Sequence, residues 1–201
     1  MKKDKLAPGG MIVLLSLLCT CVFVQTVSGT APQRQAEEKL WRLLSMPDYV
    51  ALLRHAVAPG VGDPPQFSLD DCRTQRNLSE SGRLQAKEIG ERFRSRGIDR
   101  ARVYTSQWCR CRQTAALLGL GEVRELELLN SFFRDYGRAD EQTAGLRTWL
   151  LEMEYRGPLI LVTHQVNITA LTGVHPSSGE MVVVRREKDG EIVVVGTLAS
   201  Q

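Results

Sequence analysis

The stretch Tyr49-Val50-Ala51-Leu52-Leu53-Arg54-His55 decides how this chain folds. Its first five residues form a short apolar run, which predicts a buried β-strand. The strand stops at Arg54-His55, and a loop rich in proline and glycine follows from Ala58 to Phe67. Two reactive polar side chains therefore stand at the carboxyl end of a strand, which is where ligands bind in open parallel sheets.

Helices and strands alternate along the rest of the chain. Apolar residues at helical spacing predict helices over residues 31–46, 79–96, 108–118, 139–156 and 168–171. Short β-rich runs predict further strands over 101–105, 123–128, 159–162, 181–185 and 191–196, the last two joined through Asp189-Gly190 as a hairpin. This order predicts a three-layer α/β fold, with a mostly parallel sheet, helices on both of its faces and a C-terminal antiparallel hairpin.

The first thirty residues have the composition of a leader. Lys2, Lys3 and Lys5 precede an apolar run over 11–24, and small residues follow over 27–31. This order is typical of a secretory signal peptide, so we expect residues 31–201 to form one domain in a periplasmic or other extracytoplasmic compartment. The alternative is an uncleaved membrane anchor, because residues 11–27 nearly span a bilayer.

The charge of the chain argues against a nucleic-acid partner. The formal net charge is +3, and the leader contributes +2 of it through three lysines set against Asp4. The sequence holds no Lys/Arg-rich run and no basic stripe with interleaved aromatic residues. We therefore expect no nucleic-acid partner, and contact with a membrane only through an uncleaved leader.

Three predicted strands end on residues that suit phosphate chemistry. The first ends at Arg54-His55, the second at Ser106 with Arg110 shortly after it, and the third at His164. Because parallel strands end at the same edge of a sheet, these residues should converge. Two arginines can clamp phosphate oxygens, and the helices that follow Ser106 and His164 would add N–H donors. A neutral imidazole is a competent nucleophile, and neighbouring arginines disfavour its protonation.

Four motifs resemble the histidine phosphatase superfamily, the phosphoglycerate mutase-like proteins. Residues 53–56 (LRHA) resemble its signature, 106–114 (SQWCRCRQT) its second motif and 162–165 (VTHQ) its third, while 78–86 (LSESGRLQA) resemble the helix start after the first loop. The resemblance spans about 49–198. It implies that His55 forms a phosphohistidine, that Arg54 and Arg110 bind phosphate and that His164 stabilises the transferring group. Arg112 does not occupy a matching position, and we interpret it as a solvated helix residue.

Departures from the family pattern bear on the reaction. Ala56 stands where mutase-like members have glycine, which favours a phosphatase over a mutase. Residues 128–133 lack the carboxylate that many members use as the general acid, and Gln165 stands where the phytase-like branch has Asp. The acid therefore stays open between Glu127, Asp135, another loop residue, a group of the substrate and water.

A looser resemblance concerns the substrate. Gln165 and the run over 166–173 look similar to exported phosphatases of lipopolysaccharide core heptose. This similarity implies a phosphomonoesterase that acts on a phosphorylated small molecule or on lipopolysaccharide. The alternatives are a phosphate-binding or regulatory module without turnover and a protein phosphohistidine phosphatase.

The cysteines predict a disulfide and argue against a metal site. Cys72, Cys109 and Cys111 lie outside the leader, and an exported protein meets an oxidising compartment. If the first two motifs build one pocket, Cys72 lies near Cys109 and Cys111; we favour Cys109 slightly as its partner, against three buried free thiols. One residue between two cysteines is too few for a structural zinc site, and the chain has no clustered carboxylates for magnesium, so we expect no metal and no cofactor.

Overall fold

The computed structural model describes Met1, residues 30–187 and residues 189–200. The expected leader therefore lies, apart from Met1 and Thr30, outside the described residues. Within the described part of the chain, no helix combines the length and the apolar character needed to cross a membrane.

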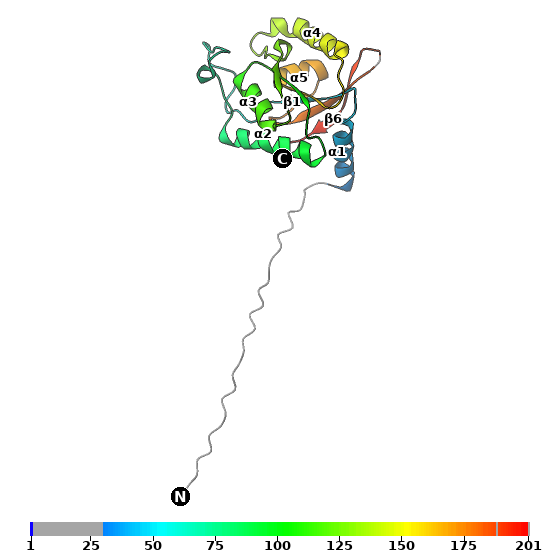
Figure 1. The fold of residues 1–201 in the computed structure, drawn as a ribbon. Helices are drawn as coiled ribbons and strands as arrows, with labels where there is room; N and C mark the ends of the chain where they lie inside the picture. Colours follow the sequence, from blue (N-terminus) through cyan, green and yellow to red (C-terminus); the bar gives the residue numbers. More distant parts are fainter. Residues whose placement is uncertain (2–29, 188, 201) are drawn as a thin grey trace.

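A sheet forms the centre of the domain, between two layers of helices (Figure 1). It has six strands, in the order β3-β2-β4-β1-β5-β6. The first four of these strands pair in parallel, whereas β5 runs antiparallel to both β1 and β6. The prediction of a mostly parallel sheet with a C-terminal antiparallel hairpin is thus confirmed. The strands are β1 Tyr49–Arg54, β2 Arg102–Thr105, β3 Val123–Glu125, β4 Leu159–Thr163, β5 Met181–Arg186 and β6 Ile192–Leu198.

Helices cover both faces of the sheet, as predicted (Figure 1). Side chains alternate along β1: Ala51 and Leu53 pack against the first three helices, while Val50 and Leu52 pack against the last two. All four are almost fully buried, which explains why the strand is a continuous apolar run. The helices are α1 Ala31–Leu43, α2 Glu80–Ser95 and α3 Cys109–Leu118 on one face, and α4 Ala139–Glu152 and α5 Gln165–Thr172 on the other.

The predicted strand over 123–128 is too long. β3 ends at Glu125, and a 3₁₀ helix, η2, runs over Glu127–Leu129. The turn buries Leu129 completely in the core under α4 and α5. It also places Asn130 among the buried polar residues of the site described below.

The predicted helix over 139–156 ends early, at Glu152. Arg186 donates from Nη1 to the carbonyl oxygens of Leu150 and Met153, both at 2.8 Å, and so satisfies carbonyls that the helix leaves free. Beyond them Tyr155 packs into the core, where its hydroxyl donates to the carbonyl oxygen of Tyr49. These contacts hold the segment that follows the end of the helix.

Candidate active site

Strand register brings His55 and His164 together. In the parallel pair of β1 and β4, Arg54 lies opposite Thr163, so the next residue on each strand is a histidine. The N–H of His55 donates to the carbonyl oxygen of Thr163 at 3.0 Å and extends the ladder by one bond. The two imidazole centroids lie 5.5 Å apart at the carboxyl edge of the sheet.

The hydrogen bonds of His55 define its tautomer. Its Nδ1 lies 2.8 Å from the carbonyl oxygen of Ala56, which can only accept, so Nδ1 carries the proton. The lone pair therefore lies on Nε2, which accepts from Nε of Arg110 at 3.2 Å. Burial, followed by the charge of Arg110, holds the pKa of His55 well below its ordinary range. The ring is thus held neutral, and Nε2 is its unprotonated nitrogen.

Arg110 bridges the two histidines. It lies in the first turn of α3, is 3% exposed, and directs Nε toward His55 and Nη2 toward Nδ1 of His164 at 3.3 Å. Because this is the N-terminus of α3, the positive end of the helix dipole also faces this region, and the first turn contains no acidic residue that would offset it. Arg110 is therefore placed to stabilise negative charge between the imidazoles.

A polar chain orients His164 from behind. Because Nδ1 accepts from Arg110, the neutral ring has its proton on Nε2, which donates to Oγ of Ser106 at 2.9 Å. Ser106 in turn donates to Oδ1 of Asn130 at 3.2 Å. Burial, then Arg110 and His55, hold the pKa of His164 well below its ordinary range. Ser106 and Asn130 are positioning residues that sequence analysis did not assign.

Two further arginines complete a cationic pocket. Arg54 donates from Nη1 to the carbonyl oxygen of Pro176 at 2.9 Å, and its buried Nε has no hydrogen-bond partner among the described residues. Arg76, which sequence analysis missed, donates to the carbonyl oxygens of Ala58 and Gly62. Burial, followed by the charge of Arg110, lowers the pKa of both Arg54 and Arg76. The three guanidinium groups repel one another, and a bound anion would reduce this electrostatic repulsion.

A cavity of about 570 Å³ opens above these groups. Its walls combine the site with aromatic and loop residues: Arg54, His55, Asp63, Phe67, Arg76, Trp108, Arg110, Phe133, Arg134, Asp135, Arg138 and His164 are among them. The volume is typical of sites for small molecules.

The helix-start motif secures the backbone after His55. Gly82 of α2 lies so close to this segment that a Cβ would meet the carbonyl oxygen of Val57 at 2.0 Å, which only glycine allows. Gln85 accepts from the N–H of Val57, and Thr114 of α3 accepts from the N–H of Ala56. The motif residues therefore fix the direction in which His55 projects.

Asp63 is the carboxylate that sequence reasoning missed. It is the one charged residue between His55 and Asp70, in the Pro/Gly-rich loop. Its side chain is 8% exposed and forms an ion pair with Arg110. Of the two acid candidates, Glu127 is exposed and outside the cavity lining. Asp135 is an exposed residue of the lining, and its carboxylate lies 3.9 Å from Arg138.

Arg112 lies outside the cavity lining, although it is only two residues from Arg110. Its guanidinium forms an exposed ion pair with Glu125 and donates to the carbonyl oxygen of Leu69. Across the described residues, no group of three or more His, Cys, Asp or Glu side chains is arranged to hold a metal ion.

The structure bridges Cys72 and Cys109 by a disulfide, the pairing that sequence analysis favoured slightly. The bridge joins the loop after the first motif to the first residue of α3, one position before Arg110. Cys111 is a buried free thiol whose Sγ lies 3.4 Å from Nε2 of His164, and burial raises its pKa to about 12.

A neutral buried histidine, a second buried histidine, the buried Arg110 and two half-buried arginines at the carboxyl edge of this sheet define a phosphatase of the histidine-dependent class. Residues 50–148, which include His55 and Arg110, match the sequence profile of the histidine phosphatase superfamily (branch 1). Over these residues the chain is similar to this superfamily. No curated protein matches the chain.

Solved structures share the fold at low identity. The protein histidine phosphatase SixA complexed with tungstate is 16% identical, with a TM-score of 0.54 over 76% of this chain and 97% of that one. Phosphoserine phosphatase from Entamoeba histolytica, with 3-phosphoglyceric acid, is 14% identical, with a TM-score of 0.53 over 76% and 98%. A mycobacterial glucosyl-3-phosphoglycerate phosphatase with VO3 is 18% identical, with a TM-score of 0.54 over 73% and 96%.

Proposed function

We propose that this protein hydrolyses small phosphomonoesters through a phosphohistidine formed on Nε2 of His55. The observation that carries the proposal is the fixed tautomer of His55, whose Nδ1–H donates to Ala56 while Nε2 faces Arg110. A nucleophile that is already neutral and oriented needs no separate base to remove a proton.

The first half-reaction transfers the phosphoryl group to the enzyme. The Nε2 lone pair of His55 attacks phosphorus, the P–O ester bond breaks, and the alcohol oxygen leaves with the bonding pair. Arg54 and Arg110 offset the charge of the transferring group, and His164 lies beside them in the pocket. No carboxylic acid contacts either histidine among the described residues, so we assign the proton for the leaving oxygen to water or to a group of the substrate.

The second half-reaction regenerates the enzyme. Water attacks the phosphohistidine, the P–N bond breaks, and the electron pair returns to Nε2 of His55. The water proton that is released balances the one taken up by the alcohol. The net reaction converts one phosphomonoester and one water into one alcohol and inorganic phosphate.

The cavity supports a substrate that is larger than phosphate and anionic. Five arginines and two aspartates line it, so positive charge is in excess even after a phosphate dianion binds. Phe67, Phe133 and Trp108 supply flat apolar surface on which a sugar ring can stack. We therefore propose an envelope sugar phosphate, such as lipopolysaccharide core heptose phosphate, as the substrate. The names of two relatives of the same fold, a phosphoserine phosphatase and a glucosyl-3-phosphoglycerate phosphatase, also describe small anionic phosphomonoesters.

Two features support an extracytoplasmic location for this reaction. The leader has the order of charges and apolar residues that export signals use. The Cys72–Cys109 disulfide is of the kind that persists in oxidising compartments.

A protein phosphohistidine is the second candidate substrate, because no carboxylic acid contacts either histidine among the described residues. An imidazole leaving group that is protonated in the substrate needs no acid from the enzyme, unlike an alkoxide. The relative named as the protein histidine phosphatase SixA fits this alternative.

Purified protein should therefore be assayed against a panel. The panel would contain an aryl phosphate, heptose and hexose phosphates, phosphoserine and a phosphohistidine peptide, each followed by phosphate release. We expect turnover of the aryl phosphate and the highest kcat/KM on a sugar phosphate. Preference for the phosphohistidine peptide would favour the second candidate. Phosphate binding without turnover of any member would instead establish a binding module.

A further inference from the structure

Asp63 is a buried charged group to which the proposed reaction gives no task. Its carboxylate accepts three kinds of N–H, from three residues in two parts of the chain. Nη1 of Arg110 lies 2.9 and 3.1 Å from the two oxygens, the indole Nε1 of Trp108 lies 3.1 Å away, and the backbone N–H of Arg76 lies 2.9 Å away. One side chain from the first loop thus joins the start of α3 to the segment that precedes α2.

The ion pair with Asp63 makes different nitrogens of Arg110 face the loop and the two histidines. Nη1 is held by Asp63, while Nε and Nη2 face His55 and His164. The Nε–Nη2 edge of a guanidinium presents two parallel N–H groups, which match two oxygens of a phosphoryl group. Asp63 therefore selects which edge of Arg110 faces the reacting centre.

The surrounding loop is built to hold this carboxylate in place. The carbonyl oxygen of Gly62 accepts from Nε of Arg76 at 3.0 Å, and that of Asp63 lies 3.4 Å from Nη1 of Arg134. Gly60 and Gly62 both adopt positive φ, at 87° and 69°, a conformation that suits glycine. The loop thus carries its one charged side chain into the pocket.

A negative charge beside a phosphate site has a second effect. It repels a phosphate dianion and so weakens the binding of the product. Without that charge, Arg110 would also be free to turn Nη1 toward a bound anion. The two effects act on different measurements, since orientation affects kcat whereas repulsion affects the dissociation constant of phosphate.

We propose that Asp63 is a positioning residue that directs the Nε–Nη2 edge of Arg110 at the transferring phosphoryl group and keeps inorganic phosphate from binding tightly. This inference rests on the proposed function of the site. All three contacts of Asp63 are with donors, so it serves as an acceptor and not as the missing acid.

The test replaces the carboxylate by an amide of the same shape, Asp63→Asn. We expect the dissociation constant of inorganic phosphate, measured by calorimetry, to fall about 10-fold or more because a repelling charge is lost. We expect kcat on an aryl phosphate to fall about 10-fold or more because Arg110 is no longer oriented. Phosphate binding that is unchanged or weaker, or a kcat that stays at the wild-type value, would overturn the proposal.

A double-mutant cycle shows whether Asp63 acts through Arg110. In an Arg110→Ala background, Asp63→Asn should change kcat by less than about twofold, because the residue it positions is absent. Additive losses would contradict the positioning role. A defect that grows with the pKa of the leaving alcohol, from aryl to alkyl phosphates, would instead identify Asp63 as the acid and overturn the proposal.

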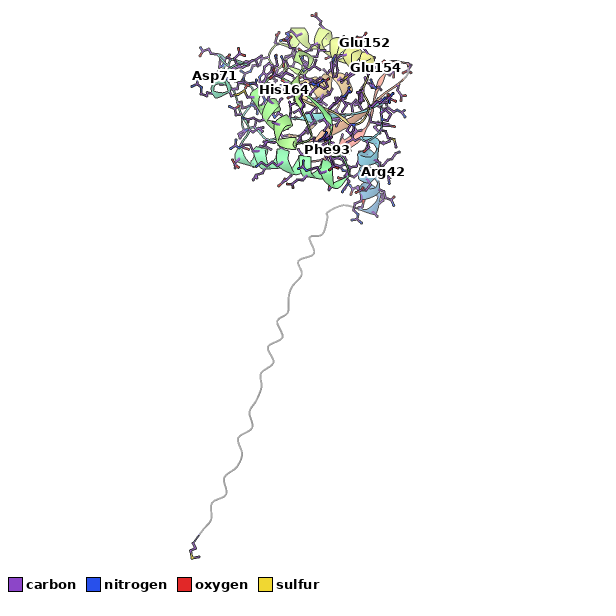
Figure 2. The ribbon with its side chains drawn as sticks, in the orientation of Figure 1. Arg42, Asp71, Phe93, Glu152, Glu154 and His164 are labelled. Carbon is purple, nitrogen blue, oxygen red and sulfur yellow. A yellow bond between two sulfur atoms is a disulfide. The ribbon has the colours of Figure 1, made fainter. Side chains whose placement is uncertain are left out.

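Controls separate this proposal from folding and from the proposed function. Asp71→Asn removes a carboxylate that pairs with exposed Arg73 at the edge of the molecule, away from His164 (Figure 2), and should behave as wild type. Asp63→Ser provides a second neutral variant with the same expected tightening of phosphate if Asp63→Asn melts below the assay temperature. Calorimetry with phosphate tests the effect of Asp63 on phosphate binding even if the wild type hydrolyses no ester. A lack of ester hydrolysis by the wild type would contradict only the proposed function.

Discussion

Nε of Arg110 donates to Nε2 of His55 across 3.2 Å, so the cation and the proposed nucleophile are in contact in the free enzyme. A neutral imidazole is the acceptor in this contact, and the charge of Arg110 helps to keep it neutral. An incoming phosphoryl group must replace this hydrogen bond with bonds to its own oxygens. The site is therefore preorganised for phosphate binding.

Arg110 and Arg112 form a matched pair for mutation, because they lie two positions apart on one helix. Arg110→Ala should lower kcat/KM on an aryl phosphate by about 10²–10³-fold, as loss of a buried charge-stabilising donor does. Arg112→Ala should stay within about threefold of wild type, because its side chain forms an exposed ion pair. Equal losses in the two variants would show that the phosphate site has been placed on the wrong face of α3.

The buried histidines make stability depend on pH. The pKa of both His55 and His164 is lowered in the folded state, mainly by burial. Below a pH of about 6.5, the two histidines therefore become protonated in the unfolded chain while they stay neutral in the folded chain. The stability that the neutral histidines contribute is fully present above that pH and is lost as the pH falls toward their pKa values in the folded state. The melting temperature should therefore decrease from pH 7.5 to pH 5.

Replacement of a buried histidine tests the origin of this pH dependence. His164→Gln should melt with a shallower dependence on pH, whereas His175→Gln, which changes the exposed third histidine, should melt with the wild-type dependence. An identical slope in His164→Gln and wild type would assign the acid sensitivity to other groups.

The Cys72–Cys109 disulfide should contribute to stability and to activity. It closes a loop of 37 residues, which corresponds to about 3–4 kcal/mol of stabilisation. It also fixes the start of α3 next to Arg110. Cys72→Ser should therefore lower the free energy of unfolding, measured by denaturant titration, and reduce kcat/KM. Wild-type stability in this variant, with the bridge shown by mass spectrometry in the parent, would contradict the role assigned to it.

Cys111 should be unreactive while the protein is folded. Its thiol is fully buried, and burial raises its pKa to about 12, so almost no thiolate forms at neutral pH. Iodoacetamide followed by peptide mass spectrometry should label Cys111 only in denaturant. Labelling in the native protein at the rate of a free thiol would mean that the wall behind His164 opens to solvent.

The site residues at the strand ends could be predicted, because the pattern of apolar residues and the parallel pairing of the strands are enough to place them. The apolar runs before His55, Ser106 and His164 indicate parallel strands, and parallel strands end at one edge. Asp63 and Arg76 could not be placed in the same way, since they lie in irregular segments that only tertiary contacts bring over the site. The signal that the sequence does give for Asp63 is that it is the one charged residue in its loop.

The segment after β3 shows a second limit of the sequence. Residues 123–128 have strand-like composition, but the chain turns at Glu127 because burial of Leu129 and the bonds of Asn130 outweigh local preference. Trp108 likewise looks like an ordinary core aromatic, yet its indole donates to Asp63 and its ring packs edge-on against His164. Such dual roles appear only when the contacts are known.

The central claim is that His55 carries the phosphoryl group. The most direct measurement is rapid acid-free quenching of the enzyme with a phosphomonoester, followed by peptide mass spectrometry under alkaline conditions that preserve phosphohistidine. We predict a phosphoryl group on His55 that turns over with substrate, and a fall in kcat of about a thousandfold or more in His55→Ala. Steady turnover with no phosphohistidine at His55, or a His55→Ala variant that keeps more than about a tenth of the rate, would contradict the account.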